Sequence, residues 1–223
     1  MPIPVLNATQ AAAWDERART SAAIPGRVLM EAAGRAVAQL LARDFPSQLE
    51  RGVLVAAGHG NNGGDGWVVA RALGAGGVRV WAAERESERS PDCEANRKLA
   101  LGEGVELLAS DAAWPETGVV VDALLGTGAS GEPRGAIGEL AQRVAQYRGP
   151  TVAVDGPTGL DLSTGEAHGP VRADLTEVGL VLLYLSLFFA LTSAGEYVKL
   201  FVEAVEAKEQ RLAEEDEAKD EAG

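Results

Sequence analysis

Short runs of β-branched residues that end at glycine or aspartate alternate along this chain with Ala- and Leu-rich segments of helical periodicity. A repeat of strand, helix and strand indicates a parallel sheet that helices cover on both faces. We therefore predict one α/β domain with a mainly parallel sheet. The predicted strands cover residues 53–57, 78–82, 105–108, 119–122 and 151–155, and the predicted helices cover residues 9–22, 28–41, 66–73, 91–101 and 137–147.

The balance of charges argues against nucleic acid as the main partner. The 223 residues include 33 Asp and Glu against 20 Lys and Arg, a formal net charge of −13, so phosphates would be repelled rather than attracted. Cys93 is the only cysteine, and His59 and His168 are the only histidines, which excludes an internal disulfide and a zinc or iron–sulfur site. This composition fits a reducing cytoplasm. The first ten residues do not resemble a secretory signal, and no export is expected.

Two segments near the C-terminus differ from the rest of the chain. Residues 178–195 carry no charge, but their strongly apolar part, residues 180–191, is shorter than a membrane span. A buried strand or core helix suits that length better, and a membrane-tethered chain is the alternative. Residues 203–223 contain nine acids and three bases, which indicates a solvated helix or an interaction tail. We predict a domain at residues 1–202 followed by an acidic tail at residues 203–223.

Residues 58–66, GHGNNGGDG, follow the first predicted strand and open a helix. Glycines in this context let backbone N–H groups approach a phosphate, and we expect Gly63 or Gly64 to adopt a positive φ or to contact a ligand. The run satisfies G-x-G-x-x-G, but an ordinary Rossmann dehydrogenase needs an acid about twenty residues later, and Glu84 lies further on. The sequence contains no P-loop motif. The alternative is a glycine-rich turn in which Asp65 caps a helix.

Asp122 and Asp155 end two of the predicted strands, and a glycine-bearing turn follows each of them. Because ligands of an open parallel sheet bind outside the carboxyl ends of the strands, we expect both carboxylates to converge with Asn61 and Asn62 on one crevice. Asn amides, a carboxylate and the hydroxyl of Thr158 are hard oxygen ligands, suited to an alkali or alkaline-earth cation. Asp155 is the candidate for proton transfer. Taken singly, each aspartate also fits the role of a turn or helix cap.

Four blocks of the chain resemble, in this order, the YjeF N-terminal-domain family, the NAD(P)H-hydrate epimerases, which include the apolipoprotein A-I-binding proteins. The blocks are LMEAAGR at residues 29–35, GNNGGDG at residues 60–66 with Ala70 and Arg71, DALLGTG at residues 122–128, and VDGPTGLD at residues 154–161 with Thr164 and Gly165. This combination is far more specific than any one motif. The resemblance implies a three-layer α-β-α Rossmann-like fold, usually a homodimer. It also implies an isomerase that interconverts the R and S forms of hydrated NADH or NADPH (NADHX and NADPHX), with a bound potassium ion (K+).

The resemblance implies a role for each matching position. Asp155 would be the catalytic residue, and the potassium ion would be held at Asn62, Asp122 and Thr158. An NAD(P)H-hydrate dehydratase, fused in many bacterial relatives and not expected in a chain that ends at Gly223, would be the functional partner. The hydrated dinucleotide would be contacted by Asn61, Asn62, Gly63, Gly64, Asp65, Gly126, Thr127, Gly128, Ala129, Ser130, Gly131, Glu132 and Asp155.

Three departures from the family pattern bear on the activity. Thr158 stands where the family usually has Ser, which keeps the hydroxyl, and Gly156 stands where it usually has Ile, which loosens the turn. The family also carries a Lys after a strand in the region where residues 177–191 of this chain contain none. Lys199 is the first one available, so proton transfer is expected to rely on Asp155 and water. The alternative is a catalytically weak dinucleotide-binding or protein-interaction module on the same fold.

Overall fold

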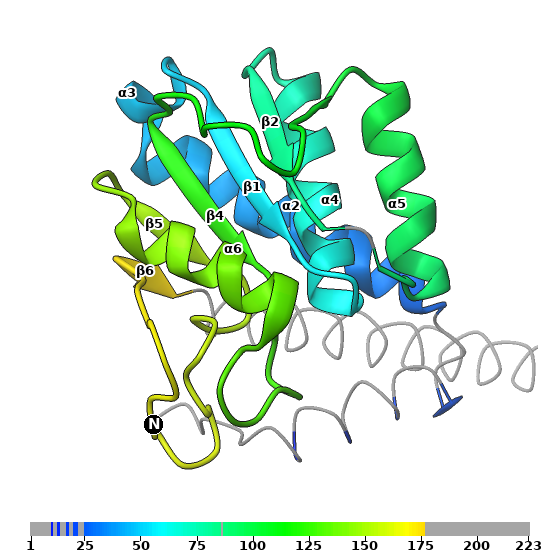
Figure 1. Cartoon of the computed structure of the whole chain (residues 1–223). Coiled ribbons are helices and arrows are strands. Elements are labelled where there is room, and N and C mark those ends of the chain that lie inside the picture. The colour runs from blue at the N-terminus through cyan, green and yellow to red at the C-terminus, as the bar shows by residue number, and fades with distance from the viewer. Residues whose placement is uncertain are drawn as a thin grey trace, which may run out of the picture. The chain divides into compact units, whose positions relative to one another are not determined.

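The computed structural model describes residues 25–85 and 87–176 together with five isolated positions, which are Gln10, Ala13, Arg17, Thr20 and Ser21 (Figure 1). These five positions are helical and fall within the helix predicted at residues 9–22. The chain divides into two units, Met1–Val181 and Leu182–Gly223, and every described residue belongs to the first. The predicted boundary at residue 202, the apolar run and the acidic tail lie outside the described residues. Among the residues that are described, no helix has the length and apolar character to cross a membrane.

Six parallel strands form one sheet in the order β3-β2-β1-β4-β5-β6. This order runs outward in both directions from β1 and β4, as in doubly wound α/β folds, and the predicted α/β fold with a mainly parallel sheet is confirmed. The elements are α2 (Gly26–Asp44), α3 (Pro46–Leu49), β1 (Val53–Ala57), α4 (Asn61–Ala75), β2 (Val80–Ala83), α5 (Pro91–Gly102), β3 (Glu106–Leu107), β4 (Val119–Ala123), α6 (Gly135–Gln146), β5 (Thr151–Ala153) and β6 (Leu175–Thr176).

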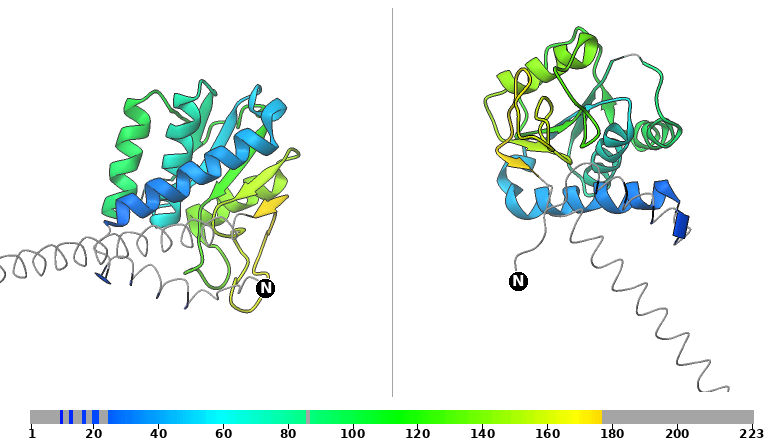
Figure 2. Two further views of the ribbon diagram at one scale, coloured as in Figure 1. Left: turned by 180° about the vertical axis from the view of Figure 1, so that it is seen from behind. Right: turned by 90° about the horizontal axis from the view of Figure 1, so that it is seen from below.

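Side chains of β1 alternate between the two faces of the sheet, and each face has its own helices. Val53 and Val55 belong to a buried cluster that includes residues of α2, α4 and α5, whereas Leu54 and Ala56 belong to a cluster with residues of α6. Figure 1 shows α6 in front of the sheet. The left panel of Figure 2, seen from behind, shows α2, α4 and α5 on the opposite face. All residues of β1 and β4 are buried, as expected for a parallel sheet that is covered on both sides. The predicted three-layer arrangement is therefore confirmed.

Several element boundaries differ from the predictions by a few residues, and two of these differences, at the carboxyl ends of the strands, bear on the site. α4 begins at Asn61 and not at Gly66, so the predicted glycine loop is the first turn of a helix. Glycine is a poor helix former, but the close approach of other backbone segments outweighs that propensity here. β5 ends at Ala153, which places Asp155 in a turn beyond the strand. The short elements α3 and β6 were not predicted, since four residues and two residues are too few to show a period.

Candidate functional site

The carboxyl ends of β1, β4 and β5 bring three connections together where the strand order changes direction. They are the turn from β1 into α4, residues 124–134 after β4, and residues 154–174 after β5. In Figure 1 this is the lower edge of the sheet, and the long connections after β4 and β5 hang below it. Ligands of doubly wound sheets bind at this position, so the side chains gathered here form the candidate site.

The backbone that follows β4 binds two side chains of this site directly. The N–H of Leu124 donates to Oδ1 of Asp122 at 3.2 Å, and the N–H of Leu125 donates to Oγ1 of Thr158 at 3.2 Å. These two leucines were not among the predicted site residues. They contribute backbone N–H groups, which every residue except proline has, so the sequence of side chains does not reveal this role.

The next two residues hold Asp155. The N–H of Thr127 donates to Oδ2 of Asp155 at 2.8 Å. A Cβ placed on Gly126 would lie 2.6 Å from that same Oδ2 and 3.2 Å from the Cβ of Asn62. Gly126 therefore allows the Asp155 carboxylate and the Asn62 side chain to approach the same backbone position.

Asp122 is a buried carboxylate, 2% exposed, whose hydrogen-bond donors named here are all uncharged. Besides Leu124, Thr158 donates to it twice at 2.8 Å, from its hydroxyl to Oδ1 and from its N–H to Oδ2. Burial raises the pKa of the Asp122 carboxyl, while these hydrogen bonds act in the opposite direction. A buried carboxylate held by neutral donors is stabilised by a nearby cation.

Asp155 has an unusual backbone conformation. At φ 68° it is the only non-glycine residue of the described part of the chain with a positive φ. The N–H of Gly156 donates to the carbonyl oxygen of Val154 at 2.7 Å, and this bond together with the positive φ makes a γ-turn of the rare, strained class. A conformation of this kind costs about 1–3 kcal/mol and persists where the surroundings enforce it, often at functional sites.

Asn62 supplies the clearest sign that the site takes a ligand. Its side chain is buried, 8% exposed, and neither Oδ1 nor Nδ2 has a hydrogen-bond partner in the described structure. An unpaired buried polar group costs about 1–3 kcal/mol. A bound polar molecule or ion would supply the missing partners.

The glycines of residues 58–66 serve the close packing of backbone. Neither Gly63 nor Gly64 has a positive φ, so the expectation of that conformation is wrong. A Cβ on Gly63 would lie 2.0 Å from the carbonyl oxygen of Gly58, and a Cβ on Gly58 would lie 2.0 Å from that of Leu124. These contacts place the first turn of α4 directly beside the ends of β1 and β4. The N-cap residue of α4, Gly60, makes no side-chain cap.

Asn61 lies at the edge of this group. It is exposed, and its Oδ1 accepts a hydrogen bond from Oγ of Ser90 at 3.2 Å. Ser90 also donates its N–H to the carbonyl oxygen of His59 at 3.0 Å and caps α5 by accepting from the N–H of Cys93. Ser90 was not among the predicted site residues, although a serine followed by Pro91 is a recognisable helix start. Asp65 is partly buried in α4.

The predicted residues 128–132 lie on the outer part of the loop after β4. They are exposed except for Ala129, which is partly buried and donates its N–H to the carbonyl oxygen of Gly126 at 3.0 Å. A Cβ on Gly169 would lie 3.4 Å from Cγ of Glu132, so this loop contacts the connection after β5. The structure thus brings together Asn62, Asp122, Gly126, Thr127, Asp155 and Thr158, and it leaves residues 128–132 at the rim.

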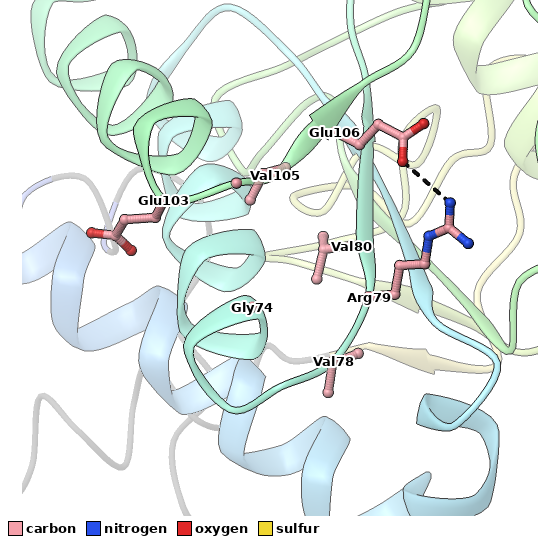
Figure 3. A pocket seen from close by; sticks show the side chains of 8 residues that line it. Gly74, Val78, Arg79, Val80, Glu103, Val105 and Glu106 are labelled. Carbon is pink, nitrogen blue, oxygen red and sulfur yellow. Dashed lines mark hydrogen bonds and ion pairs between the residues drawn. The ribbon is translucent and has the colours of Figure 1, made fainter.

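Two hollows lie at the amino ends of the strands, away from this site. One, of about 220 Å³, is shown in Figure 3, where Arg79 and Glu106 form an ion pair of 3.4 Å and Glu103 lies apart from them. The other, of about 610 Å³, is lined mainly by residues 114–118 and 146–150. Neither hollow contains a predicted site residue. Both are at the edge opposite to the one where doubly wound sheets bind ligands.

The described domain is similar to known proteins in sequence and in fold. The family model described as YjeF-related protein N-terminus matches residues 26–179. The NAD(P)H-hydrate epimerase of Pirellula staleyi is 42% identical over 174 residues, which cover 73% of this chain and 75% of that protein. The crystal structure of yeast ynu0, YNL200c, has a TM-score of 0.71 at 29% sequence identity and matches 78% of this chain and 79% of its own.

Longer proteins match over the same region. The bifunctional NAD(P)H-hydrate repair enzyme Nnr of Thermanaerovibrio acidaminovorans is 41% identical over 171 residues, which cover 72% of this chain and 33% of that protein. The protein of the same name from Escherichia coli is 43% identical over 152 residues, 66% of this chain and 29% of its own length. The matched region thus spans about a third of these bifunctional relatives.

Proposed function

This chain belongs to the family of YjeF-related protein N-termini, and we propose that it is an NAD(P)H-hydrate epimerase, an isomerase that interconverts the R and S forms of hydrated NADH and NADPH. The Pirellula staleyi relative bears the name of this activity and matches most of this chain. The observation that carries the proposal is the position of the Asp155 carboxylate. It sits in a strained turn, against Gly126 and beside the buried, unpaired amide of Asn62.

The reaction inverts the ring carbon that bears the added hydroxyl, and we assign the proton transfer to Asp155. Its carboxyl group gives a proton to the hydroxyl, the C–O bond breaks, and water leaves. The electron pair of the ring nitrogen stabilises the planar cation that results. Water then adds to the opposite face and returns a proton to the carboxylate, so that the enzyme is regenerated. The N–H of Thr127 holds Oδ2, which assigns the proton exchange to Oδ1.

We assign the diphosphate of the substrate to the N-terminus of α4. This 15-residue helix has no side-chain cap, and the positive end of its dipole with its uncapped N–H groups favours a phosphate. The N–H of Thr127 is engaged by Asp155, so we do not assign that group to the phosphate. Residues 61–65 and 126–132 then line the two sides of the bound dinucleotide.

We propose potassium as the resident cation, held by Asn62, Asp122 and Thr158. The oxygen lone pairs that remain free on these three side chains support this set of ligands. A carboxylate offers about four lone-pair positions, of which Asp122 uses three. The Thr158 hydroxyl donates one hydrogen bond and accepts one, which leaves a lone pair, and Oδ1 of Asn62 is unpaired. The bound cation would offset the negative charge of Asp122 and of the substrate phosphates.

We further propose an NAD(P)H-hydrate dehydratase as the functional partner. An epimerase alone only equilibrates the two epimers, so a second enzyme that consumes one of them is needed to clear both. We propose a homodimer as the working form and the cytoplasm as its location, where the free, buried Cys93 would stay reduced.

The test is proton NMR of a mixed pool of R and S hydrates with an S-specific dehydratase present in excess. With this protein added in catalytic amount, we expect the R form to disappear faster than it does spontaneously. If the R form disappears no faster than it does without the protein, while the protein still binds the hydrate, the chain would instead be a dinucleotide-binding module that does not catalyse the reaction.

A further inference from the structure

Leu162 occupies the space that a side chain at position 156 would fill. A Cβ on Gly156 would lie 2.3 Å from Cδ1 of Leu162 and 3.0 Å from its Cγ. Gly156 does not have a positive φ, and it precedes Pro157, a position that favours the extended backbone which β-branched residues accept. The backbone conformation therefore does not require glycine here. Instead, the side chain of Leu162 fills the space beside Gly156, and a side chain at position 156 would displace it.

Gly156 is also the residue that closes the turn of Asp155. Its N–H donates to the carbonyl oxygen of Val154 at 2.7 Å, across the residue with φ 68°. Leu162 thus packs on the residue whose hydrogen bond maintains the strained conformation. Thr127 holds the carboxylate itself from the neighbouring loop.

Leu162 belongs to a compact turn with its own internal bonds. Leu160 and Ala167 form an antiparallel bridge across its base. Oδ1 of Asp161 accepts from the N–H groups of Ser163 at 2.8 Å and Thr164 at 3.0 Å. These bonds hold residues 160–167 together, so the turn itself supports the position of Leu162 beside Gly156.

We propose that Leu162 is a positioning residue for Asp155. It holds the peptide of Gly156 in place and so keeps the Asp155 carboxylate oriented toward the substrate. The effect on catalysis rests on the proposed epimerase function, whereas the effect on the turn does not.

The first test compares Leu162→Ala with the wild type. Loss of the contact should lower kcat for epimerisation about tenfold to a hundredfold, as small misplacements of a catalytic group do, with KM changed far less. The amide proton of residue 156 should exchange with solvent faster in NMR. Leu101→Ala is the matched control, because Leu101 is also partly buried but packs against the core elsewhere. It should lower the melting temperature without these two effects.

The second test is a reciprocal rescue. The double variant Gly156→Val with Leu162→Ala moves three side-chain carbons from one side of the contact to the other. It should recover most of the lost kcat and of the amide protection, whereas Gly156→Val alone should be as impaired as Leu162→Ala. Additive losses in the double variant, or normal exchange at residue 156 in Leu162→Ala, would overturn the proposal. A wild type without epimerase activity would reject the proposed function instead, and the amide exchange would still decide the role of Leu162.

Discussion

The backbone N–H of Thr127 donates to Oδ2 of Asp155 at 2.8 Å, although the two residues follow different strands of the sheet. This bond joins the connection after β4 to the turn after β5. It also orients one carboxylate oxygen by a rigid backbone donor, which leaves the other for proton exchange. The site therefore depends on how closely the two loops approach, and Gly126, which has no side chain, allows the approach of the Asp155 carboxylate.

Asp155→Asn should lower epimerisation about 10²–10⁴-fold, the usual contribution of a general acid–base group, while affinity for the hydrate changes far less. The variant keeps an oxygen for Thr127, and Asn tolerates a positive φ better than most residues, so the turn should persist. Single-turnover kinetics and calorimetric binding measure the two effects. Asp111→Asn, an exposed change away from the site, is the control. Near-normal turnover in Asp155→Asn would place proton transfer on another group.

Gly126→Ala should displace the Asp155 carboxylate, because the new Cβ would lie 2.6 Å from Oδ2. We expect a loss of about 10²-fold in kcat with little change in melting temperature. Gly102→Ala, at the end of α5 and outside the site, has no atom within 4 Å of its Cβ and should be close to wild type. Equal activity of the two variants would contradict the role assigned to Gly126.

Gly63→Ala and Gly74→Ala make the same change in the same helix and should have opposite effects on stability. At Gly63 the Cβ would lie 2.0 Å from the backbone oxygen of Gly58, so overpacking should cost about 1–3 kcal/mol or more of unfolding free energy. At Gly74 no atom lies within 4 Å, and Ala should stabilise the helix by about 0.5–1 kcal/mol. Denaturant unfolding of both variants checks this. A neutral Gly63→Ala would show that close backbone packing is not the reason for this glycine.

Potassium should raise the melting temperature of the wild type relative to tetramethylammonium at equal ionic strength, since an ion that binds only the native state stabilises it by mass action. Asn62→Ala removes an unpaired buried amide and should shrink the difference between the two salts. Differential scanning fluorimetry measures the melting temperature of each protein in both salts. Identical wild-type melting temperatures in the two salts would argue against a structural cation.

Cys93 should resist alkylation in the folded protein. Burial raises the pKa of its thiol to about 11, and the thiolate is the reactive form, so at pH 8 nearly all of the thiol is protonated as well as covered. Mass spectrometry after iodoacetamide treatment should show slow modification in buffer and fast modification in urea. Rapid labelling of the native protein would show that α5 opens readily at its first turn.

The periodicity of the chain was enough to predict the parallel sheet and its helical layers. It also placed Asp122 and Asp155 at one edge, because all carboxyl ends of parallel strands lie on the same side. The residue types at that edge, which are carboxylates, amides and a hydroxyl, indicated a site with oxygen ligands.

The tertiary structure decided how these groups are held. Residues 61–66 look like a loop because glycine disfavours helices, but they form the start of α4, where Gly58 and Ala123, from two other segments, leave no room for side chains at Gly63 and Gly66. The turn of Asp155 is strained and depends on Thr127 and Leu162, and the residues next to Asp155 in the sequence do not predict these contacts. Local patterns report the preferences of a segment, whereas contacts between distant segments can override them, and those contacts exist only after the chain has folded.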